Sequence, residues 1–232
     1  VGKLSLMTNA LYLYYNSLEG TVPSEVGQLS SLTNNLWLHY NSLEGTVPTE
    51  VGKLSLLTDS LNLETNSLTG ALPTQLGSLS ALKGYVQIRA NELGGSVPTE
   101  FGALTSITGA LNIEVNSVAG PLPTQLGSLS ALTDYVSLAA NSFSGAIPSE
   151  VGKLSLMTNA VWLYQNKLNG TVPSQIGRLS LLTWAFEAYV NSLTGTGPSE
   201  LGAFHNLTAH FNLYSNELEG SIPSELGRLR AL

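Results

Sequence analysis

The segment NSLEGTVPSEVGQL, residues 16–29, contains a pattern that returns along the whole chain of 232 residues. Asparagine recurs at every twenty-fifth position after residue 16, without a slip. Nine repeats of 25 residues fill 1–225, and residues 226–232 begin a tenth. We number the positions of each repeat as columns 1 to 25, counted from Val1. A fixed period of this length predicts one repeat array over 1–232 with no internal domain boundary.

Glycine occupies columns 2 and 20, and proline occupies column 23, in all nine repeats. All but four of the 23 glycines, and all but one of the 10 prolines, fall in these columns or at Gly227. The turn-forming residues therefore belong to the repeat and not to linkers. Glycine at column 20 permits a positive φ angle, and proline at column 23 suits an extended segment.

Columns 1, 4, 7, 11, 13, 18 and 22 carry the apolar side chains, and Gly197 is the one residue there without such a side chain. Around columns 11 and 13 apolar and polar residues alternate, as in the LYLY of residues 11–14. Such alternation is typical of a short strand with one buried face. Stacked repeats would join these strands into one parallel sheet, with neighbours about 4.8 Å apart.

The column-16 asparagines directly follow the predicted strands. Each amide offers two donors and one acceptor, which the backbone needs where it bends away from the sheet. We therefore expect a ladder of inward-facing amides whose replacement destabilises the fold. Its members are Asn16, Asn41, Asn66, Asn91, Asn116, Asn141, Asn166, Asn191 and Asn216.

The quoted segment resembles the plant-type leucine-rich repeat, N-x-L-x-G-x-[IV]-P-x-x-[LIV]-G-x-L, and all nine repeats match it, with Gly197 the main exception. This sequence motif is also similar to repeat families of diatoms and other algae. The resemblance implies a right-handed superhelix with a concave parallel sheet, a second short-strand sheet near columns 18–22, and little helix. It also implies a binding role, because relatives include receptor-kinase ectodomains and polygalacturonase inhibitors.

Two departures from the plant pattern stand out. The repeat has 25 residues where the plant repeat has 24, and the extra residue precedes the strand, so we expect a uniform change of curvature or twist. Plant relatives carry cysteine-bearing caps, whereas this chain has no cysteine. The sequence therefore predicts an uncapped array that is an excerpt of a longer one.

Columns 10, 12, 14 and 15 face outward from the predicted sheet and vary most, as a recognition surface would. Aromatic rings concentrate in repeats 1–2 and 7–9, on either side of a plainer centre that includes Asn112. Two interpretations stay open, namely ligand contact and aromatic packing that merely covers the sheet. The candidate ligand-binding residues are Tyr12, Tyr14, Tyr15, Trp37, His39, Tyr40, Trp162, Tyr164, Tyr189 and Tyr214.

Catalytic and metal-binding constellations are not evident, and we expect neither an enzyme nor a cofactor. His205 and His210 share a repeat without a third ligand, and His39 has no obvious nucleophile beside it. Asp59 and Asp134 are three repeats apart, about 14 Å at sheet spacing, too far for a paired-carboxylate site. The glutamates of column 25 form a solvated edge, with weak cation binding as the alternative.

The net charge of −7 argues against nucleic acid as a partner. No apolar stretch reaches the roughly 18 residues of a membrane span, so we expect no membrane insertion. Two glycosylation motifs, at Asn169 and Asn206, are predicted to lie on turns and favour an extracellular or cell-surface location. A protein, peptide or carbohydrate ligand fits these features.

Repeats 8 and 9 depart from the pattern together. Ala188 and Gly197 are small where other repeats carry larger side chains. The nearby residues Trp184, Phe186, Phe204 and Phe211 are oversized. We interpret this as an exchange that keeps the core volume and not as a ligand pocket.

Three functions are compatible with these features to different degrees. The first is a non-enzymatic extracellular scaffold whose open ends favour head-to-tail self-association into a fibre. The second is a recognition module, a receptor ectodomain or an inhibitor, that binds a ligand through the concave sheet. The third, ice binding by column 21, is disfavoured because the column reads Thr, Thr, Ala, Ser, Pro, Ala, Thr, Thr, Ser.

Overall fold

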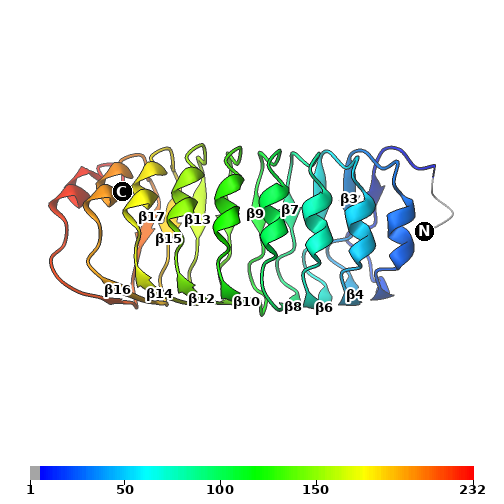
Figure 1. The fold of residues 1–232 in the computed structure, drawn as a ribbon, viewed down its shortest axis with the longest axis horizontal. Helices are drawn as coiled ribbons and strands as arrows, with labels where there is room; N and C mark the ends of the chain where they lie inside the picture. The colour runs from blue at the N-terminus through cyan, green and yellow to red at the C-terminus, as the bar shows by residue number, and fades with distance from the viewer. Residues whose placement is uncertain (1–5) are drawn as a thin grey trace.

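A computed structural model describes residues 6–232 of the chain. Each repeat forms one turn of an elongated coil, here called a rung, and the rungs stack from the N-terminal end to the C-terminal end (Figure 1). Short helices line one side of the stack, here called the helical face (Figure 1). The predicted β-rich repeat solenoid is confirmed.

One nine-stranded parallel sheet runs the length of the described array, and its outward surface is here called the sheet face. Adjacent strands come from adjacent repeats and pair at equivalent columns, so that Leu36 pairs with Leu61 and Trp37 with Asn62. Columns 11 and 13 point into the core, as the alternation predicts. The strands are β1 (Leu11–Tyr12), β3 (Asn35–Trp37), β5 (Ser60–Asn62), β7 (Val86–Gln87), β9 (Leu111–Asn112), β11 (Val136–Ser137), β13 (Ala160–Trp162), β15 (Ala185–Glu187) and β17 (His210–Asn212).

A second row of strands is present as expected, but it forms two sheets within the described residues. The division falls between β8 and β10. Two backbone bonds still join these rungs, from the Ser117 N–H to Leu93 at 2.7 Å and from the Ala119 N–H to Gly95 at 2.6 Å, whereas Pro121 has no N–H for a further one. The first of these sheets contains β2 (Glu19–Thr21), β4 (Ser42–Thr46), β6 (Ser67–Ala71) and β8 (Glu92–Gly94). The second contains β10 (Ala119–Pro121), β12 (Ser142–Ala146), β14 (Lys167–Thr171), β16 (Ser192–Gly195) and β18 (Glu217–Leu218).

Each repeat also forms one turn of 3-10 helix directly after its column-23 proline, which is extended. The glycine at column 2 lets neighbouring helices touch, because a Cβ on Gly52 would lie 2.3 Å from the Gln75 carbonyl oxygen. The helices are η2 (Ser24–Gln28), η3 (Thr49–Lys53), η4 (Thr74–Ser78), η5 (Thr99–Ala103), η6 (Thr124–Ser128), η7 (Ser149–Lys153), η8 (Ser174–Arg178), η9 (Ser199–Ala203) and η10 (Ser224–Arg228).

The predicted apolar columns form one continuous core along the described array. In repeats 8 and 9, Phe186 and Phe204 are fully buried, and their ring centroids are 5.3 Å apart, beside the small Ala188. These residues fit the expected volume exchange. Trp184 does not, because its side chain is 52% exposed. Gly197 is one of the residues that line an apolar hollow of about 220 Å³ beside the last rung.

The backbone leaves each strand of the nine-stranded sheet through a left-handed residue at column 15. The nine residues have φ between 50° and 54°, although none is glycine and three are the β-branched Thr65, Val115 and Val190. This conformation is costly for such residues and persists only where the surroundings impose it. The asparagine that follows each of them supplies the bonds described below.

Candidate binding surface

Six residues of rungs 1 and 2 form a group on the sheet face that we call the N-terminal aromatic cluster: Tyr12, Tyr14, Tyr15, Trp37, His39 and Tyr40. The rings pair across the two rungs. Tyr14 stacks on His39 with centroids 4.7 Å apart, and Tyr15 stacks on Tyr40 at 4.4 Å. The Tyr12 and Trp37 rings are tilted, at 4.9 Å. The cross-strand packing that the sequence suggested is therefore present.

The rings of rung 1 are nonetheless open to solvent. Tyr12, Tyr14 and Tyr15 are 51%, 38% and 68% exposed, whereas His39 beneath them is only 9% exposed. Burial lowers the pKa of His39, and the Glu64 carboxylate partly offsets this by raising it. The cluster therefore presents a fixed aromatic surface, because each exposed ring rests on a more buried one.

Four buried polar atoms near this cluster have no hydrogen-bond partner within the described chain. They are Oδ1 of Asn35, Nε1 of Trp37, Nδ1 of His39 and Nε of Arg89. All four belong to the outward columns of rungs 2 and 4. Buried polar atoms are rarely left unpaired, so these atoms mark a part of the sheet face with unused bonding capacity.

The C-terminal aromatic cluster comprises Trp162, Tyr164, Tyr189, Tyr214 and Tyr135. The rings of Tyr164 and Tyr189 stack at 4.6 Å, and Tyr189 and Tyr214 are 5.8 Å apart. Tyr135, which the sequence reasoning missed, lies 5.2 Å from Trp162. Its position in column 10, one of the outward columns, was the signal that could have identified it.

The acidic residues of the sheet face hold the aromatic rings in place. Glu64 accepts a hydrogen bond of 3.3 Å from the Tyr40 hydroxyl and forms an ion pair of 3.5 Å with Arg89. Glu114 accepts from the hydroxyls of Tyr164 at 2.7 Å and Ser137 at 3.2 Å. Both carboxylates therefore already have hydrogen-bond or ion-pair partners on the sheet face.

Several outward-column residues of the plainer centre are buried. Ser137 and Ala139 of rung 6 are fully buried, and Asn112 of rung 5 is only 4% exposed. Nε2 of Gln87 donates a hydrogen bond of 2.8 Å to the hydroxyl oxygen of Tyr135, which lies two rungs away. Long side chains from neighbouring rungs cover the small ones. Because Asn112 is buried among them, we expect its replacement to change the stability of the fold.

The column-16 asparagines bond the backbone of two successive rungs. Nδ2 of Asn66 donates to the carbonyl oxygens of Leu63 and Leu38, both at 3.1 Å, and Oδ1 accepts from the Leu43 N–H at 3.0 Å. The same three contacts recur at Asn41, Asn91, Asn116, Asn141, Asn166, Asn191 and Asn216. Asn16 donates to Leu13 and Tyr14 of its own rung.

A threonine ladder at column 8 accompanies the asparagines. The Thr58 hydroxyl donates to the Thr33 carbonyl oxygen at 2.8 Å, one rung away. Column 8 holds threonine in every repeat except the fourth, which has Lys83. Together the two ladders tie the backbone together on both sides of each strand.

The remaining polar candidates have local partners. Asp59 and Asp134 accept from Asn35 and Asn159, both at 2.9 Å. The column-25 glutamates accept from the hydroxyl that precedes them, as Glu150 does from Ser149 at 3.2 Å. Within residues 6–232, no group of three or more acidic, histidine or cysteine residues is placed to hold a metal ion.

The two glycosylation motifs differ in setting. Asn206 is exposed on a turn, as expected, and its Nδ2 donates to the Ser180 carbonyl oxygen at 2.9 Å. Asn169 is also exposed but lies within strand β14, so its predicted turn location is wrong. As for membrane insertion, the part of the chain described here has no helix with the length and apolar character of a span.

Stacked 25-residue rungs, an asparagine ladder and a variable aromatic sheet face define a leucine-rich-repeat solenoid, and the chain belongs to the plant-type leucine-rich-repeat family. The comparison with solved structures places it beside plant receptors. It is 33% identical to the plant peptide hormone receptor RGFR1, solved in complex with RGF2, with a TM-score of 0.91 over all of this chain. It is 31% identical to the Arabidopsis receptor kinase HAESA, with a TM-score of 0.83 over 94% of this chain.

The chain spans only 36% of the length of each of these two receptors. It also resembles a plant ice-binding protein, at 26% identity and a TM-score of 0.75, covering 96% of this chain and 69% of that one. No family model matches the sequence, and no curated protein matches it. The likeness to algal repeats stays a prediction.

Proposed function

We propose that this chain is a non-enzymatic recognition module that binds a peptide or an extended protein segment on its sheet face. We prefer this recognition module to the extracellular scaffold, which is the other main function that the sequence suggests. Its support is that HAESA and RGFR1 are described in complex with peptide ligands. An extracellular or cell-surface location belongs to the same proposal.

One observation carries the proposal, namely that the rings of Tyr14 and Tyr15 are exposed while stacked on His39 and Tyr40. A ring held in this way loses little conformational freedom when a ligand packs against it. Tyrosine and tryptophan side chains also supply most of the energy at protein interfaces. Packing that only covers the sheet would not need rings that are half open to solvent.

A phage-displayed library of random peptides provides the test. Peptides selected on the wild-type chain should lose at least about tenfold in affinity for a Tyr14→Ala/Tyr15→Ala variant. Trp184→Ala is the matched control, since Trp184 is equally exposed but lies outside both aromatic clusters. Selected peptides that bind both variants as well as the wild type would contradict the proposal.

End-to-end assembly is a second proposal, and it concerns the 232-residue polypeptide itself. Ile222 is 83% exposed and Leu18 is 38% exposed, each beside an apolar hollow of about 220 or 240 Å³ respectively. Leu11 and Val22, two inward residues of the first rung, are buried, so this end exposes less apolar surface than a fully open rung would. Val1 and Leu4 lie outside the described residues.

Contact between such ends is heterologous, so it would propagate into a filament unless it closed into a ring. Sedimentation at rising protein concentration measures it. We expect the average mass to increase with concentration, and a stable monomer at high micromolar concentration in moderate salt would refute the assembly.

A further inference from the structure

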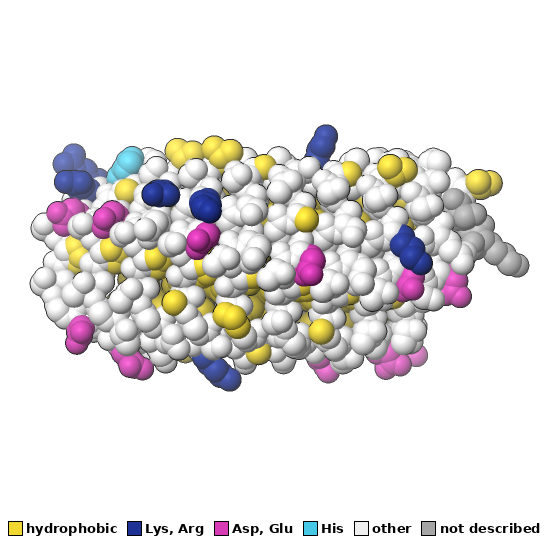
Figure 2. All heavy atoms as spheres, viewed as in Figure 1, with side chains coloured by type: hydrophobic (Ala, Val, Ile, Leu, Met, Phe, Trp, Pro, Cys, Tyr) yellow, Lys and Arg dark blue, Asp and Glu magenta, His cyan; other side chains and the backbone are white. Residues whose placement is uncertain are grey.

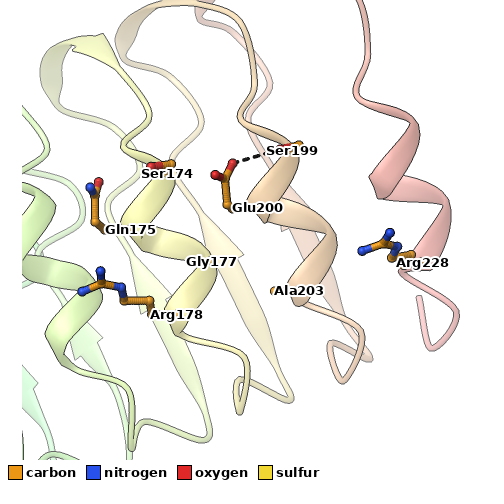
Figure 3. Close-up of a pocket in the computed structure, with 8 residues that line it drawn as sticks. All are labelled: Ser174, Gln175, Gly177, Arg178, Ser199, Glu200, Ala203 and Arg228. Atoms are coloured by element: carbon orange, nitrogen blue, oxygen red, sulfur yellow. Dashed lines mark hydrogen bonds between the residues drawn. The ribbon is translucent and has the colours of Figure 1, made fainter.

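The helical face near the C-terminal end contains a hollow of about 430 Å³ between helices η8, η9 and η10. Its lining includes Arg178, Arg228 and Glu200, together with the small Ala203 (Figure 3). Arg178, Ala203 and Arg228 share column 3 on successive rungs, so the alanine leaves a gap between two arginines. Figure 3 shows the Arg228 guanidinium group turned from η10 toward η9, into this gap.

A second hollow of about 530 Å³ adjoins the first and shares Ala203 and Arg228 with it. Its lining adds the imidazole of His205 and the guanidinium group of Arg230. The two hollows together form a shallow trough along the stack, lined by Arg178, Arg228, Arg230 and His205. Figure 3 shows the Arg178 guanidinium group turned from η8 toward the preceding helix, on the same side of its helix as that of Arg228. Figure 2 shows the dark blue and cyan side chains gathered at this end of the helical face.

The cations of this trough are unusual for the chain as a whole. The net charge is −7, with only nine lysines and arginines in 232 residues. Arg178, Arg228 and Arg230 form no ion pair within the described chain, where Arg89 and Glu64 supply the single one. Glu200 is the one carboxylate in the lining, and it accepts a hydrogen bond from Ser199 at 3.1 Å. The trough therefore presents cations that are free to bind an anion.

We propose that this trough binds a linear anionic polysaccharide, with carboxylate or sulfate groups on the arginines. The spacing suits a chain-like ligand, because Arg178 and Arg228 are two rungs apart, about 10 Å at sheet spacing. Guanidinium groups bind carboxylates and sulfated groups through paired hydrogen bonds. Ser174 and Gln175 in the same lining offer a hydroxyl and an amide to sugar hydroxyl groups.

Other polyanions fit the trough less well. Single-stranded nucleic acid is bound by aromatic rings on which bases stack, and no tyrosine, tryptophan or phenylalanine lines either hollow. An anionic membrane attracts clusters of several cations, and here Glu200 and the overall negative charge oppose that attraction. An acidic peptide would find no apolar depression for its side chains, because Ala203 is the only apolar residue in the lining.

Binding to alginate, dextran sulfate and uncharged dextran tests the proposal by microscale thermophoresis. The wild-type chain should bind alginate, dextran sulfate or both, more weakly as salt rises, and should not bind uncharged dextran. The two anionic polymers distinguish carboxylate from sulfate. An Arg178→Gln/Arg228→Gln variant should bind about tenfold more weakly, as expected for the loss of charge-assisted bonds at an exposed site.

Lys53→Gln is the matched control, since Lys53 occupies column 3 of η3 far from the trough and should leave binding unchanged. Circular dichroism on each variant checks that the fold is kept. Equal binding of the arginine variant and the wild type would overturn the proposal. Equally strong, arginine-dependent binding to phosphatidylserine vesicles or to single-stranded DNA would also overturn it. The Tyr14→Ala/Tyr15→Ala variant should bind the polysaccharide normally, which separates this trough from the sheet face.

Discussion

The hydroxyl of Tyr164 donates a hydrogen bond of 2.7 Å to Oε1 of Glu114, a residue that lies two rungs away. The phenol ring reaches across rung 6, where the same column holds Ala139, which is fully buried. Burial, followed by the hydrogen bond to Glu114, raises the pKa of Tyr164 well above its usual range. The small residue of one rung thus allows a bond between its two neighbours.

We predict that Tyr164→Phe lowers the free energy of unfolding by about 1–2 kcal/mol, because Glu114 would lose a donor in a partly buried site. Tyr189→Phe, which removes the hydroxyl of the adjacent stacked ring, should cost less. Urea denaturation measures both variants, and a cycle with Glu114→Gln isolates the coupling. Equal effects of the two phenylalanine variants would show that the bond contributes nothing.

We predict that Asn116→Ala lowers the free energy of unfolding by about 1–3 kcal/mol, since it leaves backbone groups of two rungs unpaired. Asn112→Ala is unsuitable as a silent control because Asn112 is buried. The control variant is Asn169→Ala, because Asn169 is exposed and lies outside the ladder. Similar denaturation midpoints for Asn116→Ala and Asn169→Ala would refute the role of the ladder.

We predict opposite outcomes for two glycines of column 2. A Cβ at Gly52 would lie 2.3 Å from the Gln75 carbonyl oxygen, whereas one at Gly227 would meet nothing within 4 Å. Gly52→Ala should therefore destabilise by about 1–3 kcal/mol, because backbone must move. Gly227→Ala should change stability by less than about 0.5 kcal/mol. Thermal unfolding compares them, and equal melting temperatures would contradict the close approach of adjacent helices.

We predict that His39 makes stability depend on pH. Burial holds its folded-state pKa below the ordinary value of 6.5, although Glu64 partly opposes this. The unfolded chain therefore takes up the proton first as the pH falls through 6.5, and the folded state loses stability until its own lower pKa is reached. The wild type should lose more unfolding free energy than His39→Gln between about pH 7.5 and about pH 5.5. Parallel pH profiles of the two proteins would contradict this.

Much of the fold was predictable because the repeat restricts every rung in the same way. The apolar columns around Leu36 and Leu61 had to face one core, and alternation beside them required a strand. The volume exchange around Phe186 and Ala188 was visible as a large residue beside a small one. The left-handed conformation of Val115 was not predictable, because nothing in a β-branched residue favours it.

The candidate site was only partly predictable. The outward columns identified the rings of both aromatic clusters except Tyr135, but exposure of a side chain depends on what neighbouring rungs place over it. Ser137 and Asn112 are outward by column and yet buried, whereas Tyr15 is open. The missing information is the orientation of long side chains that begin one or two rungs away.

The sequence by itself determined the architecture of this protein, because 25-residue periodicity forces each apolar column, glycine, proline and asparagine into one repeated environment. Only the tertiary structure decided which parts of the surface are available. Tyr164 covers a neighbouring rung through a bond to Glu114, 50 residues earlier in the chain. Ala203 opens a trough only because arginines lie above and below it. Both outcomes follow from contacts between rungs, and such contacts depend on the side chains of two or three repeats at once.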